Sequence, residues 1–126
     1  MEKKLVLVVD DDADIRAQIE KILAPHYRVV TAASGKECLQ NVARTRPACI
    51  VMDVMMEDLC DGLETAKQIK ASPATREIPV ILLTSVNASY DYRSQVDAGY
   101  FPHDCWMDKP VKADRLLKEI AVLVGE

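Results

Sequence analysis

The run Leu5–Val9 constrains the fold of this chain most strongly, because it consists of aliphatic residues only. Five residues are too few for a stable helix, and a strand with one face in water would alternate apolar and polar residues. The run is typical of a strand that is covered on both faces, as in parallel sheets. Similar runs follow at Arg28–Ala32, Ala48–Met52 and Pro79–Thr84, with a weaker candidate at Cys105–Asp108.

Segments with helical spacing of apolar residues separate these runs, around residues 15–23, 39–42, 63–69, 88–98 and 116–124, although the segment 88–98 is more polar. Each of them can bury one apolar stripe on a sheet. Strict alternation of strands and helices predicts an α/β fold, with a five-stranded parallel sheet, right-handed crossovers and helices on both faces.

Composition excludes several classes of function. The 126 residues are 49% hydrophobic and carry a net charge of -4, with basic residues scattered along the chain, which argues against nucleic acid or an anionic membrane as the main partner. The chain contains neither the roughly 18 consecutive apolar residues of a membrane span nor a signal-peptide core. We therefore expect a cytoplasmic protein with protein partners.

Two further expectations concern the extent of the chain and its cysteines. The last predicted helix ends just before Glu126, so we expect residues 1–126 to form a single domain, with no output domain in this chain. Whether the sequence is a whole protein or an excised part stays open. The four cysteines are evenly spread with no C-x-x-C pair, which predicts reduced, structural thiols at Cys38, Cys49, Cys60 and Cys105.

Polar residues interrupt the apolar runs at their carboxyl ends. Asp10–Asp12 follow the first run, Asp53 the third, Thr84 and Ser85 close the fourth, and Lys109 follows the fifth. The carboxyl ends of parallel strands meet at one edge of a sheet, so these side chains should lie close together. Helix capping could explain one of the first three aspartates. It does not explain Asp53, after which no helix begins directly.

Such a cluster has a definite chemistry. Two carboxylates about 4 Å apart repel by roughly 4 kcal/mol at an effective dielectric constant near 20, and Lys109 supplies only one positive charge. An all-oxygen site of this kind suits Mg²⁺ or Mn²⁺ better than Zn²⁺. A carboxylate beside such an ion can attack phosphorus to give an aspartyl phosphate. We expect Asp53 to be that carboxylate.

Together these motifs resemble the receiver domain of two-component response regulators, the CheY-like superfamily. The resemblance covers essentially the whole chain in order, and it implies a flavodoxin-like (βα)5 fold with strand order 2-1-3-4-5. The residues that carry it are Val8–Arg16, Ile50–Asp53 with Gly62, Leu82–Ser85 and Lys109–Pro110.

The resemblance implies a role for each site residue. Asp53 would be the phosphoacceptor. The metal ligands would be Asp10, partly through water, Asp11 directly, Asp53, and the backbone carbonyl of Met55. Thr84 would donate its hydroxyl to the phosphoryl group.

Further roles follow from the same resemblance. Lys109 would form an ion pair with the phosphoryl group. The peptide bond between Lys109 and Pro110 is cis in the family. Asp12 would be an additional acid near the site, and Ser85 follows Thr84. Trp106 occupies the position of the family's switch aromatic, although a fixed anchoring role is equally open.

The implied function is a signalling switch, in which the domain catalyses its own modification and is not a turnover enzyme. A sensor histidine kinase or histidine phosphotransfer protein would be the donor. The surface of the fourth helix, fifth strand and fifth helix would bind a downstream protein or form a homodimer. Met55 and Val86 occupy the positions that control access of water to the acyl phosphate, and neither side chain can orient water, so we expect slow self-dephosphorylation.

The sequence departs from the family pattern in two places. Glu57 replaces a proline of the family pattern in a longer loop at 57–61, and a second insertion lies near 100–103.

Two alternative functions stay open. A haloacid-dehalogenase-like phosphatase would use Asp10 and Asp12. That function would leave Asp53 without a role, and this sequence has no segment that corresponds to the usual cap of such phosphatases. A receiver-shaped binding module that is never phosphorylated is the other alternative, which the complete acidic, Thr and Lys set disfavours.

Overall fold

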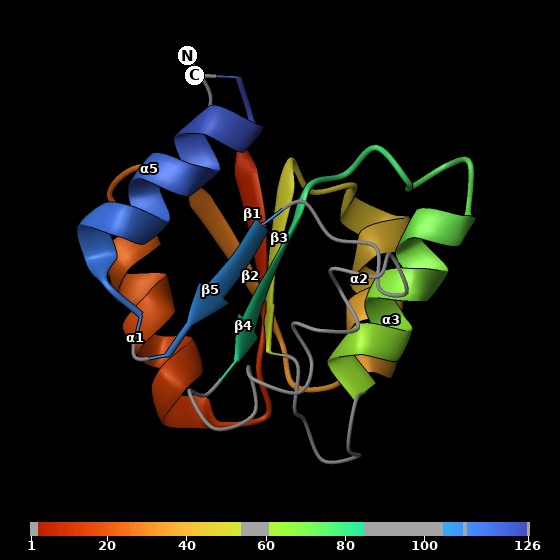
Figure 1. Cartoon of the computed structure of the whole chain (residues 1–126), viewed down its shortest axis with the longest axis horizontal. Helices are drawn as coiled ribbons and strands as arrows, with labels where there is room; N and C mark the ends of the chain where they lie inside the picture. The colour runs from red at the N-terminus through yellow and green to blue at the C-terminus, as the bar shows by residue number, and fades with distance from the viewer. Residues whose placement is uncertain (1–2, 54–60, 85–104, 110, 126) are drawn as a thin grey trace.

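The strands of the structure, a computed structural model, form one parallel sheet (Figure 1). The structure describes residues 3–53, 61–84, 105–109 and 111–125. The strand order is β2-β1-β3-β4-β5, so the predicted α/β fold and its order are confirmed. The strands are β1 (Leu5–Val9), β2 (Arg28–Ala32), β3 (Cys49–Asp53), β4 (Val80–Thr84) and β5 (Cys105–Asp108).

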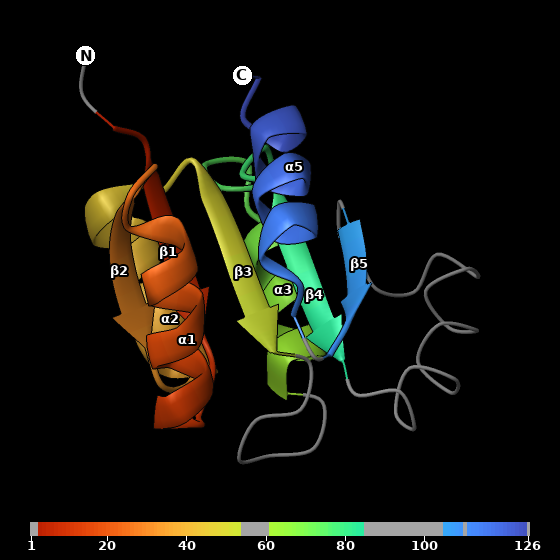
Figure 2. The same ribbon diagram turned by 90° about the vertical axis from the view of Figure 1, so that its left-hand side faces the viewer.

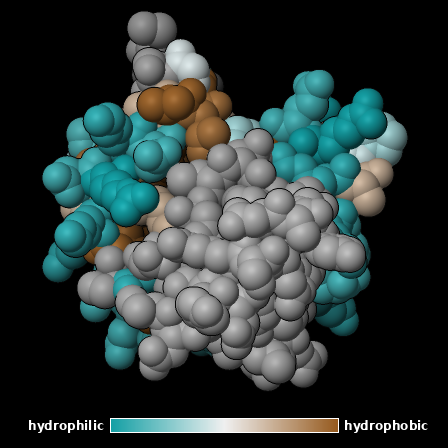
Figure 3. Space-filling model, viewed as in Figure 1, coloured by the Kyte–Doolittle hydropathy of each residue, from teal (hydrophilic) through white to brown (hydrophobic). Residues whose placement is uncertain are grey.

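Helices cover both faces of the sheet (Figures 1 and 2). Helices α1 (Ala13–Leu23) and α5 (Ala113–Leu123) lie on one face, and α2 (Gly35–Thr45) and α3 (Asp61–Ala71) on the other. Their coloured outer surfaces are mostly hydrophilic in Figure 3. No helix within the described residues has the length and apolar character needed to cross a membrane. The helix expected at 88–98 lies outside the described residues.

The strands are apolar because both of their faces are buried. Successive strand residues point to opposite faces, so β1 sends Val6 and Val8 toward α1 and α5, and Leu7 and Val9 toward α2 and α3. The first core cluster contains Val6, Val8, Ile19, Leu23, Tyr27, Cys49, Val51, Ile81, Leu83, Met107, Leu116 and Ile120. The second contains Leu7, Val9, Ala32, Cys38, Val42, Ile50, Met52, Ala66, Ile69, Val80 and Leu82.

Strand β3 lies one residue later than the predicted Ala48–Met52. Asp53 is the last residue of this strand and pairs in register with Leu83 of β4, so the prediction that it follows the strand was wrong by one position. The backbone of Asp53 is therefore held in the sheet. A side chain on a strand end is fixed more firmly than one on a loop.

Strand β4 begins at Val80, one residue later than predicted. Pro79 has no N–H to donate to a ladder, which explains why the strand starts after it. Its carbonyl still accepts the N–H of Ile50 at 2.9 Å.

Two of the cysteines agree with the structural role expected of them. Cys38 and Cys49 are buried in the core clusters on opposite faces of the sheet, and neither forms a disulfide within the described residues. Cys60 and the side chain of Cys105 lie outside the described part of the chain.

The end of α2 generates a stability prediction. Its C-cap residue Arg46 has a φ of 47°, in the left-handed region. A residue with a Cβ atom pays about 1 kcal/mol there, whereas glycine does not. Arg46→Gly keeps the N–H donated to the carbonyl of Val42 at 3.0 Å. We expect it to raise the free energy of unfolding by about 0.5–1 kcal/mol in urea denaturation. Arg46→Ala, which keeps the strained Cβ, should bring no gain; equal gains in both variants would contradict the explanation.

Candidate functional site

Three carboxylates and one ammonium group meet at the carboxyl edge of the sheet. Asp10 directly follows β1, Asp53 ends β3, and Lys109 directly follows β5. One carboxylate oxygen from each of Asp10, Asp11 and Asp53 lies within 4.8 Å of the others. The parallel topology brings together residues that are distant in the sequence.

Lys109 bridges the two buried carboxylates. Its Nζ lies 3.2 Å from Oδ2 of Asp10 and 3.2 Å from Oδ2 of Asp53. The Asp10 and Asp53 side chains are only 1% and 7% exposed, so water screens these contacts weakly. Burial by itself lowers the pKa of Lys109, but attraction to Asp53 and Asp10 and hydrogen bonds with both outweigh it and raise the pKa above its ordinary 10.5. Lys109 is therefore charged at neutral pH.

The charges of the cluster do not balance. Three carboxylates and one ammonium group leave two negative charges. Each pair of carboxylates at this separation repels by about 3–4 kcal/mol at an effective dielectric constant of 20. One divalent cation would neutralise the excess, and carboxylate oxygens are the ligands that Mg²⁺ and Mn²⁺ prefer. The residues present therefore fit a divalent cation.

Asp10 organises the loop between β1 and α1. Its backbone N–H donates to the carbonyl of Ala32 at 3.1 Å, which continues the ladder between β1 and β2. Its Oδ1 accepts the N–H of Asp12 at 2.9 Å, while Oδ2 contacts Lys109. The two oxygens of this buried carboxylate thus have different partners, one in the loop and one in the cluster.

Asp12 has a separate task from Asp10 and Asp11. It is exposed, and it is the N-cap of α1, where its side chain accepts the N–H groups of Asp14 at 2.9 Å and Ile15 at 3.3 Å. Capping therefore accounts for Asp12, whereas it does not account for the other carboxylates of the edge.

The remaining predicted residues are placed only in part. The backbone of Thr84 ends β4 opposite Asp108, and Trp106 pairs in register with Leu82 inside β5. The roles expected of the other positions stay predictions, because the side chains of Thr84 and Trp106, and the whole of Met55, Ser85, Val86 and Pro110, lie outside the described part of the structure.

Arg16 is a contact residue that its sequence context did not reveal. Its Nη1 donates to the backbone carbonyl of Asp10 at 2.7 Å. The available signal was its place early in a helix, because helical side chains point back toward the helix N-terminus. Position alone could not show which acceptor the guanidinium would reach.

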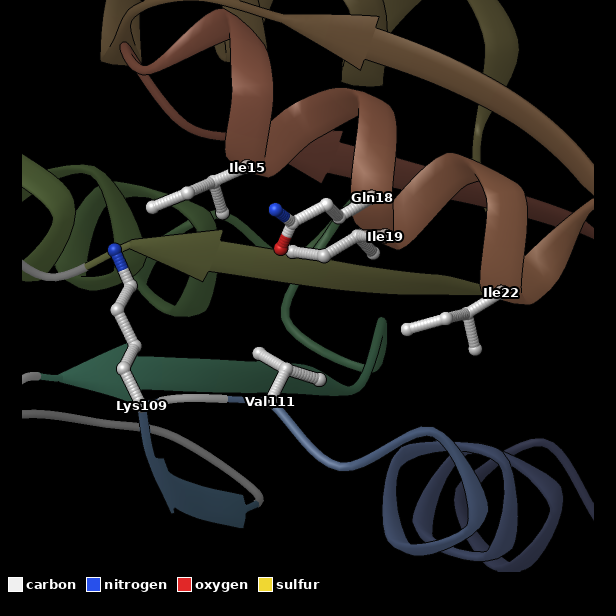
Figure 4. A pocket seen from close by; sticks show the side chains of 6 residues that line it. All are labelled: Ile15, Gln18, Ile19, Ile22, Lys109 and Val111. Carbon is white, nitrogen blue, oxygen red and sulfur yellow. The ribbon is translucent and has the colours of Figure 1, made fainter.

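A groove of about 340 Å³ adjoins the cluster between α1 and the segment that follows β5 (Figure 4). In Figure 4, Lys109 and Ile15 lie at one end and Ile22 at the other, with the polar side chain of Gln18 between them. The groove is mainly apolar and is lined by Ile15, Gln18, Ile19, Ile22, Lys109 and Val111.

The sequence matches a known protein family along most of its length. The family model for the response regulator receiver domain matches residues 6–121. The response regulator MprA of Mycobacterium leprae is 35% identical over 120 residues, which are 94% of this chain and 50% of MprA. The response regulator PleD of Caulobacter vibrioides is 38% identical over 95 residues, 75% of this chain and 21% of PleD. The chain spans half or less of the length of these relatives.

Solved structures agree along nearly the whole chain. A putative response regulator from Chloroflexus aurantiacus has a TM-score of 0.86 and 25% identity, covering 99% of this chain and all of that one. The receiver domain of a sensor histidine kinase from Pseudomonas aeruginosa, with a magnesium ion coordinated in its active site cleft, has a TM-score of 0.85 and 26% identity, covering 98% of this chain and 99% of that one. With this fold, this acidic edge and a family model that matches most of its length, the chain belongs to the response regulator receiver domain family.

Proposed function

We propose that this receiver domain is a phosphorylation-dependent signalling switch in which Asp53 accepts a phosphoryl group. The observation that carries the proposal is the bridging contact of Lys109 with Asp53 and Asp10, in one cluster with Asp11. Asp53 is buried and ends a strand, so its position relative to Lys109 is fixed. The alternative of a binding module that is never phosphorylated gives no reason for so many unbalanced charges at one edge.

In the proposed reaction, a carboxylate oxygen of Asp53 attacks the phosphorus atom of a phosphohistidine on the donor. The O–P bond forms while the P–N bond breaks, and the electron pair of that bond returns to the imidazole nitrogen. Lys109 carries its proton throughout, and its ammonium group can pair with phosphoryl oxygens after the transfer. The hydroxyl of Thr84 is the proposed further donor to the phosphoryl group.

We further propose that the cluster holds Mg²⁺ or Mn²⁺. The proposed ligands are the carboxylates of Asp10, Asp11 and Asp53 and the backbone carbonyl of Met55. A bound cation would neutralise charge on the phosphoryl oxygens. The excess of negative charge in the cluster supports this assignment, as does the magnesium ion in the similar receiver domain from Pseudomonas aeruginosa.

The proposed partners are proteins. A sensor histidine kinase or histidine phosphotransfer protein would supply the phosphoryl group, and Thr84 and Trp106 would relay the modification to the surface of segment 88–98, β5 and α5. A downstream protein or a second copy of the chain would bind there. The similarity to named response regulators and to receiver domains of sensor histidine kinases supports this part of the proposal.

The identity of the phosphoacceptor can be tested with a small phosphodonor. Phosphoramidate and Mg²⁺ should label the wild type, and peptide mass spectrometry should place the label on Asp53. Asp53→Asn should abolish labelling, because an amide is not a nucleophile for phosphorus. Asp12→Asn is the matched control and should retain it, because Asp12 caps a helix. A label on Asp10 that survives in Asp53→Asn would favour the phosphatase alternative, and a wild type that stays unlabelled would favour the binding module.

Lys109 should stabilise the metal-free fold, because it is the cation between two buried carboxylates. Lys109→Met in EDTA should lower the free energy of unfolding by about 2 kcal/mol near pH 7. Since the folded-state pKa of Lys109 is raised, its contribution is present at lower pH and is lost as the pH rises above 10.5. The difference between wild type and variant in urea denaturation should therefore shrink at high pH.

Lys67→Met is the matched control for this experiment. Lys67 Nζ lies 4.0 Å from Glu64, and the two side chains are 48% and 64% exposed. The loss of such an exposed pair should change the free energy of unfolding by less than about 0.5 kcal/mol. Equal losses in the Lys67 and Lys109 variants would contradict the importance of the buried bridge.

The lifetime of the phosphorylated state tests the sequence-based expectation for Met55 and Val86. The purified phosphoprotein, freed of donor, should lose its label slowly. Met55→Asn should shorten the half-life by about tenfold, because an amide can orient the attacking water. Met56→Asn, one residue further along the chain, should leave the half-life unchanged. A wild-type half-life of seconds, or an unchanged half-life in Met55→Asn, would refute the expectation.

A further inference from the structure

The loop that carries Asp10 and Asp11 is held by a small set of hydrogen bonds. Asp10 donates its N–H to Ala32 and accepts the N–H of Asp12 with its side chain. Its backbone carbonyl accepts from Nη1 of Arg16 at 2.7 Å. The first two bonds belong to the strand ladder and to the turn of the loop. The third is donated by the long side chain of Arg16. The start of a helix does not require the charge or the planar donor group of an arginine.

The position of Arg16 explains how it reaches this carbonyl. Arg16 is the fourth residue of α1, and its N–H donates to the carbonyl of Asp12 at 3.0 Å in the first turn. Helical side chains tilt toward the helix N-terminus, so the guanidinium folds back past Asp12 to Asp10. The distance of 2.7 Å is typical of a charge-assisted hydrogen bond, and the side chain is partly buried.

The helix itself gains little from an arginine at this place. The amino end of a helix carries partial positive charge, so a cation near it is unfavourable by about 0.3–1 kcal/mol. The contact with Asp10 is therefore better explained by what it does for the loop. A guanidinium also fixes the direction of its acceptor more firmly than an ammonium group does.

The carbonyl of Asp10 controls the backbone of Asp11. The peptide bond is planar, so fixing this oxygen also fixes the N–H and Cα of Asp11. Asp11 is exposed, and none of the hydrogen bonds found among the described residues anchors its side chain. Its carboxylate nevertheless lies in the cluster with Asp10 and Asp53. Within the described part of the chain, the backbone of Asp11 therefore sets the position from which its side chain extends into the cluster.

We infer that Arg16 is a positioning residue for the divalent cation site. It holds the Asp10–Asp11 peptide so that the Asp11 carboxylate faces those of Asp10 and Asp53, and it contacts neither the cation nor the phosphoryl group itself. The inference rests on the proposed function, because it assumes that the cluster binds a cation.

The test is a titration of the full chain with Mg²⁺, monitored by ¹H–¹⁵N NMR. Arg16→Gln should raise the Kd for Mg²⁺ by about tenfold, which is the lower end of the loss of affinity seen when a residue that supports metal ligands is removed. Arg16→Lys should raise the Kd less, because a lysine can still donate one hydrogen bond. The Asp11 amide signal should shift in the metal-free Arg16→Gln protein, as expected if the peptide has moved.

Labelling by phosphoramidate separates positioning from chemistry. In Arg16→Gln the Mg²⁺ concentration that gives half of the maximal labelling rate should rise with the Kd, while the rate at saturating Mg²⁺ stays within about threefold of wild type. A fall in the saturated rate with an unchanged Kd would overturn the inference, because Arg16 would then act on the transfer itself.

Arg44→Gln is the matched control. Arg44 also donates a 2.7 Å guanidinium hydrogen bond, from Nη2 to Oδ1 of Asn41, but on α2 and away from the cluster. The Kd of the Arg44→Gln variant for Mg²⁺ should equal that of the wild type. An Arg16→Gln Kd within twofold of wild type would overturn the inference, as would an Arg16→Gln protein without a cooperative unfolding transition in EDTA, since Arg16 would then serve folding.

The two proposals fail in different ways. A wild type that binds Mg²⁺ and is labelled on Asp53, with an unaffected Arg16→Gln variant, removes the role of Arg16 and leaves the proposed function standing. A wild type that binds no Mg²⁺ removes both.

Discussion

Burial of the strands on both faces is the constraint from which the rest of the structure follows. The described side chains of β1, β3 and β4 are almost all buried, so helices must cover the sheet on either side. Parallel strands require crossover connections, and each crossover returns the chain to the same end of the sheet. All carboxyl ends therefore meet at one edge. The removal of apolar surface from water thus decides where the polar chemistry of this protein can lie.

That edge concentrates negative charge in the folded state. Lys109 lies 99 positions from Asp10 along the chain, so the cation that offsets the carboxylates reaches them only when β5 has joined the sheet. Any cation that binds the folded cluster and not the unfolded chain would add to stability by mass action. The site therefore links folding to the proposed metal binding and the proposed reactivity of Asp53 through one charge balance.

Asp10 and Asp11 are neighbours at this edge that differ in burial and in their partners. Asp10 is fully buried, and its N–H, carbonyl and both carboxylate oxygens all have partners within the protein. Such complete pairing is what makes a buried carboxylate tolerable. Asp11 is exposed and stands in the same cluster, so it is the carboxylate that solvent and ions reach most easily. One residue builds the site, and its neighbour faces the solution.

Much of the fold and of the candidate site could be predicted from local properties. The apolar runs, the helical stripes and the polar residues at strand ends depend only on residue type and spacing, and the structure places them in one sheet with one acidic edge. The errors lay at strand ends. Asp53 belongs to β3 and Pro79 does not belong to β4, because pairing with a neighbouring strand decides where a ladder begins and ends.

The sequence by itself thus determined the succession of strands and helices along the chain, the burial of both faces of the sheet, and the kinds of side chain available at its carboxyl edge. Only the tertiary structure decided that Lys109 contacts Asp10 and Asp53 equally. Which aspartate caps α1 and which acceptor Arg16 reaches are local choices that residue type and spacing left open, and the course of the backbone between β1 and α1 settles them. Periodicity and residue type are local properties that a sequence displays directly. The distance between two atoms of remote residues depends on how the layers pack, and no local pattern contains it.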